Sequence, residues 1–200
     1  MKPRSTGYLV ENSSLIEEGV RIGGGTRISH FSHICEGATI GENCLIGDYV
    51  YIGSGVRIGN EVNIQSRVSI YPGVSVEDRV FCGPGVIFTN VIHPRAFIEE
   101  RDEFRNTLLR RGSTVGAGAT VVCGITLGRY SFAGAGSVVT RDVPDFGLVY
   151  GNPAKIEGWV CRCGHTLKTF DRNLEFIHVC PSCQSRFQVT GDGFQPISQS

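Results

Sequence analysis

Residues 26–64, TRISHFSHICEGATIGENCLIGDYVYIGSGVRIGNEVNI, carry an isoleucine at every sixth position from Ile28 to Ile64. The same step extends back to Val10 and forward to Phe88, and Cys82 is the one member of this column that is neither aliphatic nor aromatic. A fixed internal period of this kind indicates a repeat architecture, in which one small structural unit stacks on the next.

A second column of small or β-branched residues lies four positions after the first and runs from Val20 to Val86. Glycine often follows the first column directly, as at Gly41, Gly47 and Gly53. A helical period of 3.6 cannot sustain spacings of six and four together, whereas short strands joined by tight turns can. Three such segments would form one triangular coil, and successive coils would stack at about 4.8 Å by parallel strand pairing.

Three stretches carry a resemblance to a known family: TRISHFSHICEGATIG at 26–41, RVFCGPGVIFTNVIHPRA at 79–96, and TVVCGITLGRYSFAGAGSVVTRDVPDFGLVYGNPAK at 120–155. They resemble the hexapeptide-repeat acyltransferases, in particular the bacterial enzymes that acetylate the 3-amino group of UDP-2-acetamido-3-amino-2,3-dideoxy-glucuronate. The resemblance implies an all-β, left-handed parallel β-helix and covers about residues 7–155. The left hand comes from the family, because the period alone does not define it.

Composition excludes some functional classes. Lys+Arg and Asp+Glu both number 19, so the formal net charge is zero, which argues against an extended surface for nucleic acid or an anionic membrane. No stretch approaches the roughly 18 apolar residues that a spanning helix needs, and no apolar run follows the first residues. We therefore expect a cytoplasmic protein that binds neither nucleic acid nor membrane.

The repeat is interrupted once. The six-residue rhythm stops at Phe88 and does not return until Val115, which predicts a loop excursion over 89–114 that is rich in charged side chains. A long excursion from a rigid scaffold is often functional, although a tolerated surface insertion is the alternative. We expect a β-helix domain over 1–157, a second unit over 158–190, and a disordered tail over 191–200, where apolar residues are few.

The second unit contains two close cysteine pairs, Cys161 with Cys163 and Cys180 with Cys183. Pairs on two turns, brought together by an intervening hairpin, suit a tetrahedral thiolate site for structural zinc, as in a zinc ribbon. His165 replacing one thiolate and disulfide pairing are the alternatives, and a reducing cytoplasm disfavours the second. Cys44 and Cys82 fall in the inward columns and read as small core residues.

Transfer of an acetyl group from a thioester to an amine requires an oriented, deprotonated amine and a stabilised oxyanion. Asn90 matches the residue that holds the amine in the related family, although a simple turn-forming role is the alternative. His93 is the histidine of the excursion and a candidate general base, against the alternative of an ordinary surface residue. Whether His93 or the substrate itself handles the proton stays open.

The resemblance also implies residues that bind the two substrates. Candidates for the nucleotide sugar are the outward-pointing histidines and the arginines of the excursion: His30, His33, Arg95, Arg101 and Arg105. Candidates for acetyl-CoA are backbone groups around Ala133 and Gly134, with Lys155 and Arg141 for its phosphates. Glycine turns and solvated charges are the simpler interpretation of the second set.

The family implies a homotrimer with active sites between subunits. The leading hypothesis is an acetyl-CoA-dependent N-acetyltransferase acting on a UDP-3-amino sugar; alternatives on the same fold are a dTDP-amino sugar, a 4-amino sugar, or a sugar or serine hydroxyl. A γ-type carbonic anhydrase would need His30, His33 and His93 to converge on a metal, and their spacing does not match that family. A non-catalytic trimeric scaffold is a further alternative.

Overall fold

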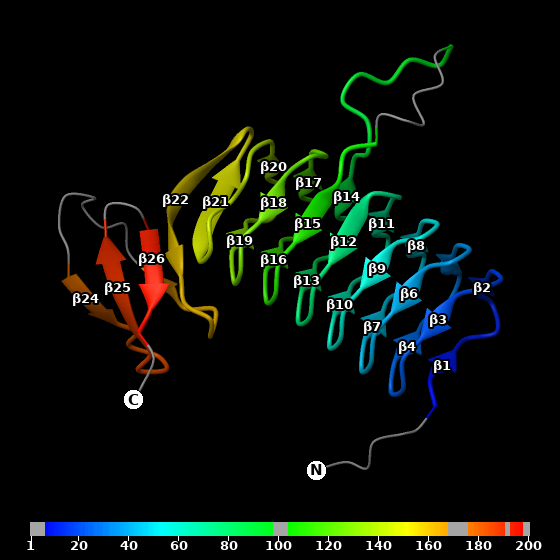
Figure 1. Ribbon diagram of the computed structural model, residues 1–200, viewed down its shortest axis with the longest axis horizontal. Helices are drawn as coiled ribbons and strands as arrows, with labels where there is room; N and C mark the ends of the chain where they lie inside the picture. The colour runs from blue at the N-terminus through cyan, green and yellow to red at the C-terminus, as the bar shows by residue number, and fades with distance from the viewer. Residues whose placement is uncertain (1–6, 98–103, 168–175, 191–192, 198–200) are drawn as a thin grey trace.

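The computed structural model describes residues 7–97, 104–167, 176–190 and 193–197, and the described chain is all β. It forms a long parallel β-helix with three faces, followed by a small antiparallel unit at its C-terminal end (Figure 1). Partner residues in neighbouring coils are eighteen apart, as in the pairing of Leu9 with Arg27, so three six-residue segments make one coil as predicted.

Face A is the sheet that begins the chain and continues past the last coil. Its parallel strands are β1 (Leu9–Val10), β4 (Arg27–Ile28), β7 (Leu45–Ile46), β10 (Asn63–Ile64), β13 (Phe81–Cys82), β16 (Thr114–Val115), β19 (Phe132–Ala133) and β21 (Gly147–Gly151). Two antiparallel strands extend it, β22 (Ala154–Val160) and β23 (Thr166–Leu167). Eight parallel strands on one face correspond to about eight turns of a left-handed β-helix.

Faces B and C complete each coil. Face B contains β2 (Leu15–Ile16), β5 (His33–Ile34), β8 (Tyr51–Ile52), β11 (Ser69–Ile70), β14 (Ile87–Phe88), β17 (Thr120–Val121) and β20 (Val138–Val139). Face C contains β3 (Arg21–Ile22), β6 (Thr39–Ile40), β9 (Arg57–Ile58), β12 (Val74–Val76), β15 (Thr107–Leu109) and β18 (Thr126–Leu127).

Both periodic columns fill the interior. The isoleucines from Ile28 to Ile70 are buried, and the small residues of the second column, such as Ala38, Val50 and Val68, pack between them in one continuous core. Cys44 and Cys82 are fully buried members of this core, as the columns predicted. Stacking identical positions in successive coils therefore gives the solenoid a core along its whole length.

Glycine plays a different role from the one a tight turn alone suggests. A Cβ on Gly23, directly after Ile22, would lie 2.6 Å from the backbone nitrogen of Glu42, so this position is small because the next coil approaches closely. The left-handed conformation falls two residues later in each repeat, at Gly25 but also at Asn43 and Tyr49. The left-handed turn position therefore accepts residues with a side chain, whereas the position where the next coil approaches closely does not.

The excursion is shorter than the sequence analysis predicted. Strand β15 already pairs with β12 and β18, and Leu109 is fully buried in the core, so the chain rejoins the solenoid well before Val115. Leu109 stands six residues before Val115, and the small, buried Ser113 stands six before Ala119. Both columns had therefore resumed earlier than the expected end of the loop at residue 114.

The C-terminal unit packs on the last coil. Strands β24 (Phe176–Val179), β25 (Arg186–Thr190) and β26 (Gly193–Pro196) form an antiparallel sheet, and Phe187 and Phe194 contact Phe146 of the solenoid. The prediction of a disordered tail over 191–200 is wrong for residues 193–196, because they form β26 and Phe194 is buried. Strand β22 runs across the expected domain boundary between residues 157 and 158.

None of the described segments forms a helix with the length and apolarity that crossing a bilayer requires.

Candidate active site along the B–C edge

One edge of the prism gathers most of the candidate residues. We call the B–C edge the line of corners between faces B and C; it carries Glu17, Cys35, Tyr71 and, where the excursion leaves the solenoid, Asn90. Figure 1 shows the excursion projecting outward between β14 and β15. Corners in successive coils lie directly above one another, so residues far apart in sequence share one continuous strip of surface.

Asn90 lies at the base of the excursion and is half-buried. Its backbone carbonyl accepts a hydrogen bond from the N–H of Arg105 (3.2 Å), which joins the two ends of the loop. Its side-chain amide makes no hydrogen bond to the described part of the chain, although its neighbour Thr89 is engaged through Oγ1 by the amide of Cys123. The backbone hydrogen bond therefore fixes the position of Asn90, while the polar atoms of its side chain have no partner among the described residues.

The other excursion residues are less constrained. His93 is exposed, and Arg95 is exposed with a hydrogen bond from Nη1 to the carbonyl of Pro94 (3.1 Å). Arg101 lies outside the described residues. Arg105 is exposed and lies across Gly124, where a Cβ would be 3.2 Å from its Cδ. The structure thus brings Arg105 beside Asn90 and places His93 three residues further along the same loop.

A basic hollow lies beyond Asn90 at the C-terminal end of the solenoid, where Arg141 of the last B–C corner meets strand β22 of face A, which contains Lys155. It has a volume of about 300 Å³, and Arg141 and Lys155 line it together with Ala154 and Ile156. Asp142 also lines it, but its Oδ1 accepts the amide of Thr126 (2.7 Å). Neither Arg141 nor Lys155 has an ion-pair partner among the described residues, so two free cations face this hollow.

Ala133 and Gly134 offer less than the sequence suggested. The Ala133 side chain is fully buried, and its carbonyl accepts the amide of Gly116 (2.8 Å). The amide of Gly134 donates to Val149 (2.7 Å), and its carbonyl accepts the Oγ of Ser137 (2.6 Å). The solenoid itself uses these three backbone groups, so a contact of this segment with acetyl-CoA would involve other backbone groups around Ala133 and Gly134 and stays a prediction.

A polar cluster occupies the B–C edge on the other side of Asn90. His33 Nε2 lies 2.5 Å from Glu17 Oε1 and 3.8 Å from Cys35 Sγ. The amide of Glu36 and the imidazole of His33 both hydrogen-bond to Glu17 and lower the pKa of its carboxyl. Hydrogen bonding with Cys35 raises the pKa of Tyr51 to about 12. The contact with Glu17 therefore fixes the His33 side chain, and the residue is still half-exposed.

His30 lies on a different edge from His33. It sits at the corner between faces A and B, where its Nδ1 is 3.0 Å from Ser13 Oγ. Within the described residues, His30, His33 and His93 do not come together as metal ligands. This arrangement gives no support to the carbonic anhydrase interpretation, which requires three converging imidazoles.

Glu17, Cys35 and Tyr51 were missed as companions of His33. The repeat period could have predicted this grouping, because residues eighteen apart in the sequence lie side by side in neighbouring coils. His33, for example, pairs with Leu15 and Tyr51. Once the coil length is known, neighbours across the B–C edge can be read from the sequence.

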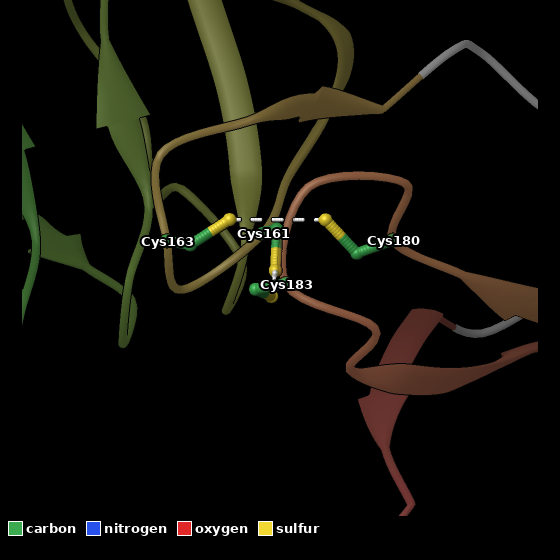
Figure 2. Close-up of side chains that lie close together, drawn as sticks. All are labelled: Cys161, Cys163, Cys180 and Cys183. Atoms are coloured by element: carbon green, nitrogen blue, oxygen red, sulfur yellow. Dashed lines mark hydrogen bonds between the residues drawn. The ribbon is translucent and has the colours of Figure 1, made fainter.

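The four C-terminal cysteines converge, as predicted. Cys161 and Cys163 lie in the turn after β22, and Cys180 and Cys183 lie between β24 and β25; their sulfur atoms all lie within 4.8 Å of one another (Figure 2). Sγ–Sγ distances are 3.5 Å for Cys161–Cys183 and 3.7 Å for Cys163–Cys180. A tetrahedron with Zn–S bonds of about 2.3 Å has edges of about 3.8 Å, so the set fits zinc.

Neighbouring groups favour a thiolate at Cys183, whereas burial raises the pKa of the Cys161 thiol in the absence of a metal ion. Ser185 Oγ lies 3.2 Å from Cys183 Sγ, and hydrogen bonds from Ser185 lower the pKa of Cys183 to about 6. Arg162 donates to the same Ser185 oxygen through Nε and Nη2, which orients the hydroxyl. His165 is exposed and stands outside the cluster, and its carbonyl accepts the amide of Cys161. Four thiolates, without His165, are the donor set that the structure presents.

Comparison with known proteins agrees with the repeat. Residues 19–54 and 37–71 match the family model described as bacterial transferase hexapeptide (six repeats), and residues 109–141 match the model for the hexapeptide repeat of succinyl-transferase. Residues 19–71 and 109–141 are therefore hexapeptide repeats of the kind found in bacterial transferases. Both matches fall on the hexapeptide-repeat solenoid, on either side of the excursion, and neither includes the C-terminal unit.

Two curated hexapeptide-repeat relatives match part of the chain. A dTDP-3-amino-3,6-dideoxy-alpha-D-galactopyranose 3-N-acetyltransferase of Aneurinibacillus thermoaerophilus is 44% identical over 87 residues, which are 44% of this chain and 43% of that protein. A galactoside O-acetyltransferase of Lactococcus lactis is 31% identical over 87 residues, 42% of each chain. The chain spans less than half the length of the curated relatives it matches.

Two solved structures share the fold. The acetyltransferase domain of PglB from Neisseria gonorrhoeae, in complex with acetyl coenzyme A, has a TM-score of 0.51 at 20% identity, with coverage of 76% of this chain and 58% of that one. A UDP-N-acetylglucosamine acyltransferase from Campylobacter jejuni has a TM-score of 0.55 at 17% identity, covering 75% and 74%. These similarities establish the β-helix fold alone.

Proposed function

We propose that this protein is an acetyl-CoA-dependent N-acetyltransferase that acts on the amino group of a nucleotide-linked sugar. The observation that carries the proposal is the position of Asn90. Its side-chain amide, which has no hydrogen-bond partner in the described part of the chain, lies on the B–C edge. The basic hollow of Arg141 and Lys155 lies on one side of it and the Glu17–His33–Cys35 cluster on the other. Two long substrates can therefore approach Asn90 from opposite directions along one strip.

Each part of the strip has a chemical task in this proposal. Arg141 and Lys155 bind phosphate groups of acetyl-CoA, whose thioester extends toward Asn90. The side-chain carbonyl of Asn90 accepts a hydrogen bond from the sugar amine and directs its lone pair at the thioester carbonyl. The nitrogen forms the new amide bond as the carbon–sulfur bond breaks, the amine loses one proton, and the CoA thiolate leaves.

The identity of the nucleotide sugar is the finer part of the proposal. The sequence resemblance favours a UDP-3-amino sugar, and the match to an enzyme named for a dTDP-3-amino sugar supports a 3-amino sugar with either nucleotide. We expect turnover of UDP- or dTDP-linked 3-amino sugars with acetyl-CoA and little turnover of 4-amino isomers. A thiol-release assay over this panel tests the expectation. Turnover of sugar or serine hydroxyls alone would replace it with O-acetylation.

We also propose that the protein is a homotrimer, on the evidence of its faces. Face C is polar, whereas faces A and B expose apolar side chains outward: Leu9, Leu45 and Phe81 on A, and Leu15 and Ile87 on B. At the edge between A and B, the exposed rings of Phe31 and Tyr49 stack 5.1 Å apart. Exposed apolar patches mark interaction surfaces, so face A of one subunit packs toward face B of the next around this aromatic edge.

His93→Ala tests the source of the general base. If His93 removes the amine proton, the substitution is expected to lower kcat by about 10²–10⁴-fold. It is also expected to remove from the pH–rate profile the limb that reports protonation of the imidazole. Retention of that limb in His93→Ala, with kcat near that of the unsubstituted protein, would assign proton removal to the substrate or solvent. The exposed neighbour Ile92, replaced by alanine, controls for disturbance of the loop.

For the C-terminal unit we propose a structural zinc ion held by Cys161, Cys163, Cys180 and Cys183. The donor set and the spacing of the four sulfur atoms support zinc. Around the cluster, Phe187 and Phe194 form an aromatic core that is continuous with Phe146 of the solenoid. Zinc would supply folding free energy to a unit too small to be stabilised by hydrophobic burial alone.

A further inference from the structure

A second hollow lies on the edge between faces C and A, away from the B–C edge. It has a volume of about 510 Å³ and is lined by Arg111, Arg129, Tyr130, Glu77 and Asp78. The amide of Tyr130 donates to the carbonyl of Arg111 (3.0 Å), which places Arg111 and Arg129 on adjacent coils. Both arginines are exposed, and neither side chain has a hydrogen-bond or ion-pair partner in the described chain.

Two guanidinium groups in neighbouring coils of one edge repel each other unless an anion lies between them. The two carboxylates of the hollow keep their charge, so its lining is formally neutral, but both are engaged by polar groups of the chain rather than by the arginines. Glu77 Oε2 accepts the amide of Arg111 (2.8 Å), and Asp78 Oδ1 accepts the amide of Asn60 (2.8 Å) and its side-chain nitrogen (3.3 Å). The planar forks of the two arginines remain available for a bidentate anion.

Tyr130 is held rigidly at the wall of this hollow. A Cβ on Gly112 would lie 2.6 Å from the ring of Tyr130, so the ring rests directly on the glycine backbone. On its other side, the ring stacks on Phe146 with a centroid distance of 5.4 Å. A fixed phenol beside two arginines is a preorganised donor for a phosphate oxygen.

The hollow and Asn90 lie at the same height of the solenoid. Asn90 stands before β15 and Arg111 follows it, so one face-C strand separates the two edges. If face A packs toward face B of the next subunit, the edge between C and A of one subunit and the B–C edge of the next form the two rims of one cleft. Arg111 and Arg129 then face the neighbouring subunit's Asn90 across that cleft.

We propose that Arg111, Arg129 and Tyr130 bind the diphosphate of a substrate whose reacting end lies at Asn90 of the partner subunit. The inference rests on the proposed function, because acetyl-CoA and nucleotide sugars both carry a diphosphate and both are long enough to span a cleft. Each active site then takes its amine-orienting residue from one subunit and its diphosphate site from the next.

Binding measurements with the double variant Arg111→Ala/Arg129→Ala test the anion site and identify its ligand. Titrations with CoA, with UDP and dTDP, and with inorganic pyrophosphate are compared with the surface control Arg57→Ala on face C. We expect pyrophosphate and one of the two substrate classes to bind about tenfold or more weakly, since each lost charge-assisted pair has an effect of that size. Unchanged affinity for all of these ligands would overturn the proposal.

The outcome also separates this inference from the proposed function. If the unsubstituted protein binds neither CoA nor a nucleotide, the proposed function fails, and the diphosphate assignment fails with it. The other case is that the unsubstituted protein binds CoA and a nucleotide, and the double variant binds all the ligands with the same affinity. The proposed function then stands and the diphosphate site is wrong. An Arg111→Lys/Arg129→Lys variant keeps the charge but loses the planar forks, and we expect an intermediate loss.

Complementation tests the intersubunit part. Asn90→Ala subunits and Arg111→Ala/Arg129→Ala subunits are co-expressed with different tags, and mixed trimers are isolated. If a site takes its parts from two subunits, about a third of the sites in the isolated mixed trimers have both intact, so activity reappears above that of either parent. No recovery in mixed trimers would show that the residues act within one subunit and would overturn the proposal.

Discussion

Replacing Cys180 with serine is expected to reduce bound zinc from about one ion per chain to less than a tenth and to unfold the C-terminal unit. Structural zinc in small cysteine-ligated units contributes about 10–16 kcal/mol of apparent binding free energy at neutral pH. Cys180 is fully buried, so its loss leaves three thiolates around an incomplete site. Elemental analysis gives the metal content, and hydrogen exchange over residues 176–190 reports whether β24 and β25 stay folded.

Two substitutions control for effects other than loss of a ligand. Ser182→Ala changes an exposed residue of the same turn and should retain zinc, and Cys123→Ala removes a buried thiol of the solenoid without touching the cluster. The assignment would be wrong if Cys180→Ser kept a full complement of zinc. It would also be wrong if the unsubstituted protein were isolated without metal and with Cys161 linked to Cys183 as a disulfide, which their 3.5 Å separation would allow on closer approach.

Loss of the C-terminal unit has a consequence for the solenoid. Strand β22 begins at Ala154, beside the hollow that contains Lys155, and ends at Val160, next to Cys161. Trp159 of the same strand stacks on Phe194 with a centroid distance of 5.6 Å. The cysteine cluster therefore lies at the far end of the strand that contains Lys155. If Lys155 binds acetyl-CoA, we expect Cys180→Ser also to weaken CoA binding.

The period determined most of the fold. Isoleucine from Ile28 to Ile64 in a six-residue step leaves few structures other than stacked three-sided coils, and the core is formed by those columns. The end of the excursion was misplaced because charged residues hide the return of the pattern at Leu109. The strand β26 was missed because its buried Phe194 is isolated in a polar stretch, and its burial depends on Phe146 of the solenoid.

The site could be predicted only in part. Asn90 was assigned from its match to the related family, at the corner where the pattern breaks, and His93 from its place in the excursion; the roles of both stay predictions. Lys155 and Arg141 were expected for the same ligand, and the structure places both on one hollow. Contacts between coils, such as that of Glu17 with His33, can be predicted only when the coil length is known as well as the residue types. The availability of backbone groups at Ala133 and Gly134 depends on hydrogen-bond partners in neighbouring segments, which residue identity does not reveal.

Asn90→Ala is expected to lower kcat by about 10²–10³-fold while the Kd for CoA changes less than twofold. The side-chain carbonyl orients the amine only in the productive complex, and removing one positioned polar group of this kind has an effect of that order. The fold at the base of the excursion should persist, because Arg105 bonds to the backbone carbonyl of Asn90 rather than to its side chain. Steady-state kinetics with the preferred amino sugar and a CoA titration measure the two quantities.

Asn106→Ala is the matched control, because Asn106 is an exposed asparagine at the other end of the same loop base and its substitution should leave kcat unchanged. Asn90→Asp distinguishes orientation from charge: a carboxylate still accepts the amine N–H but also favours the ammonium form, so its deficit should shrink as the pH rises. If Asn90→Ala instead raised KM for both substrates with kcat intact, Asn90 would be a turn-forming residue that supports the loop, and the amine would have to be oriented by His93 or Arg105.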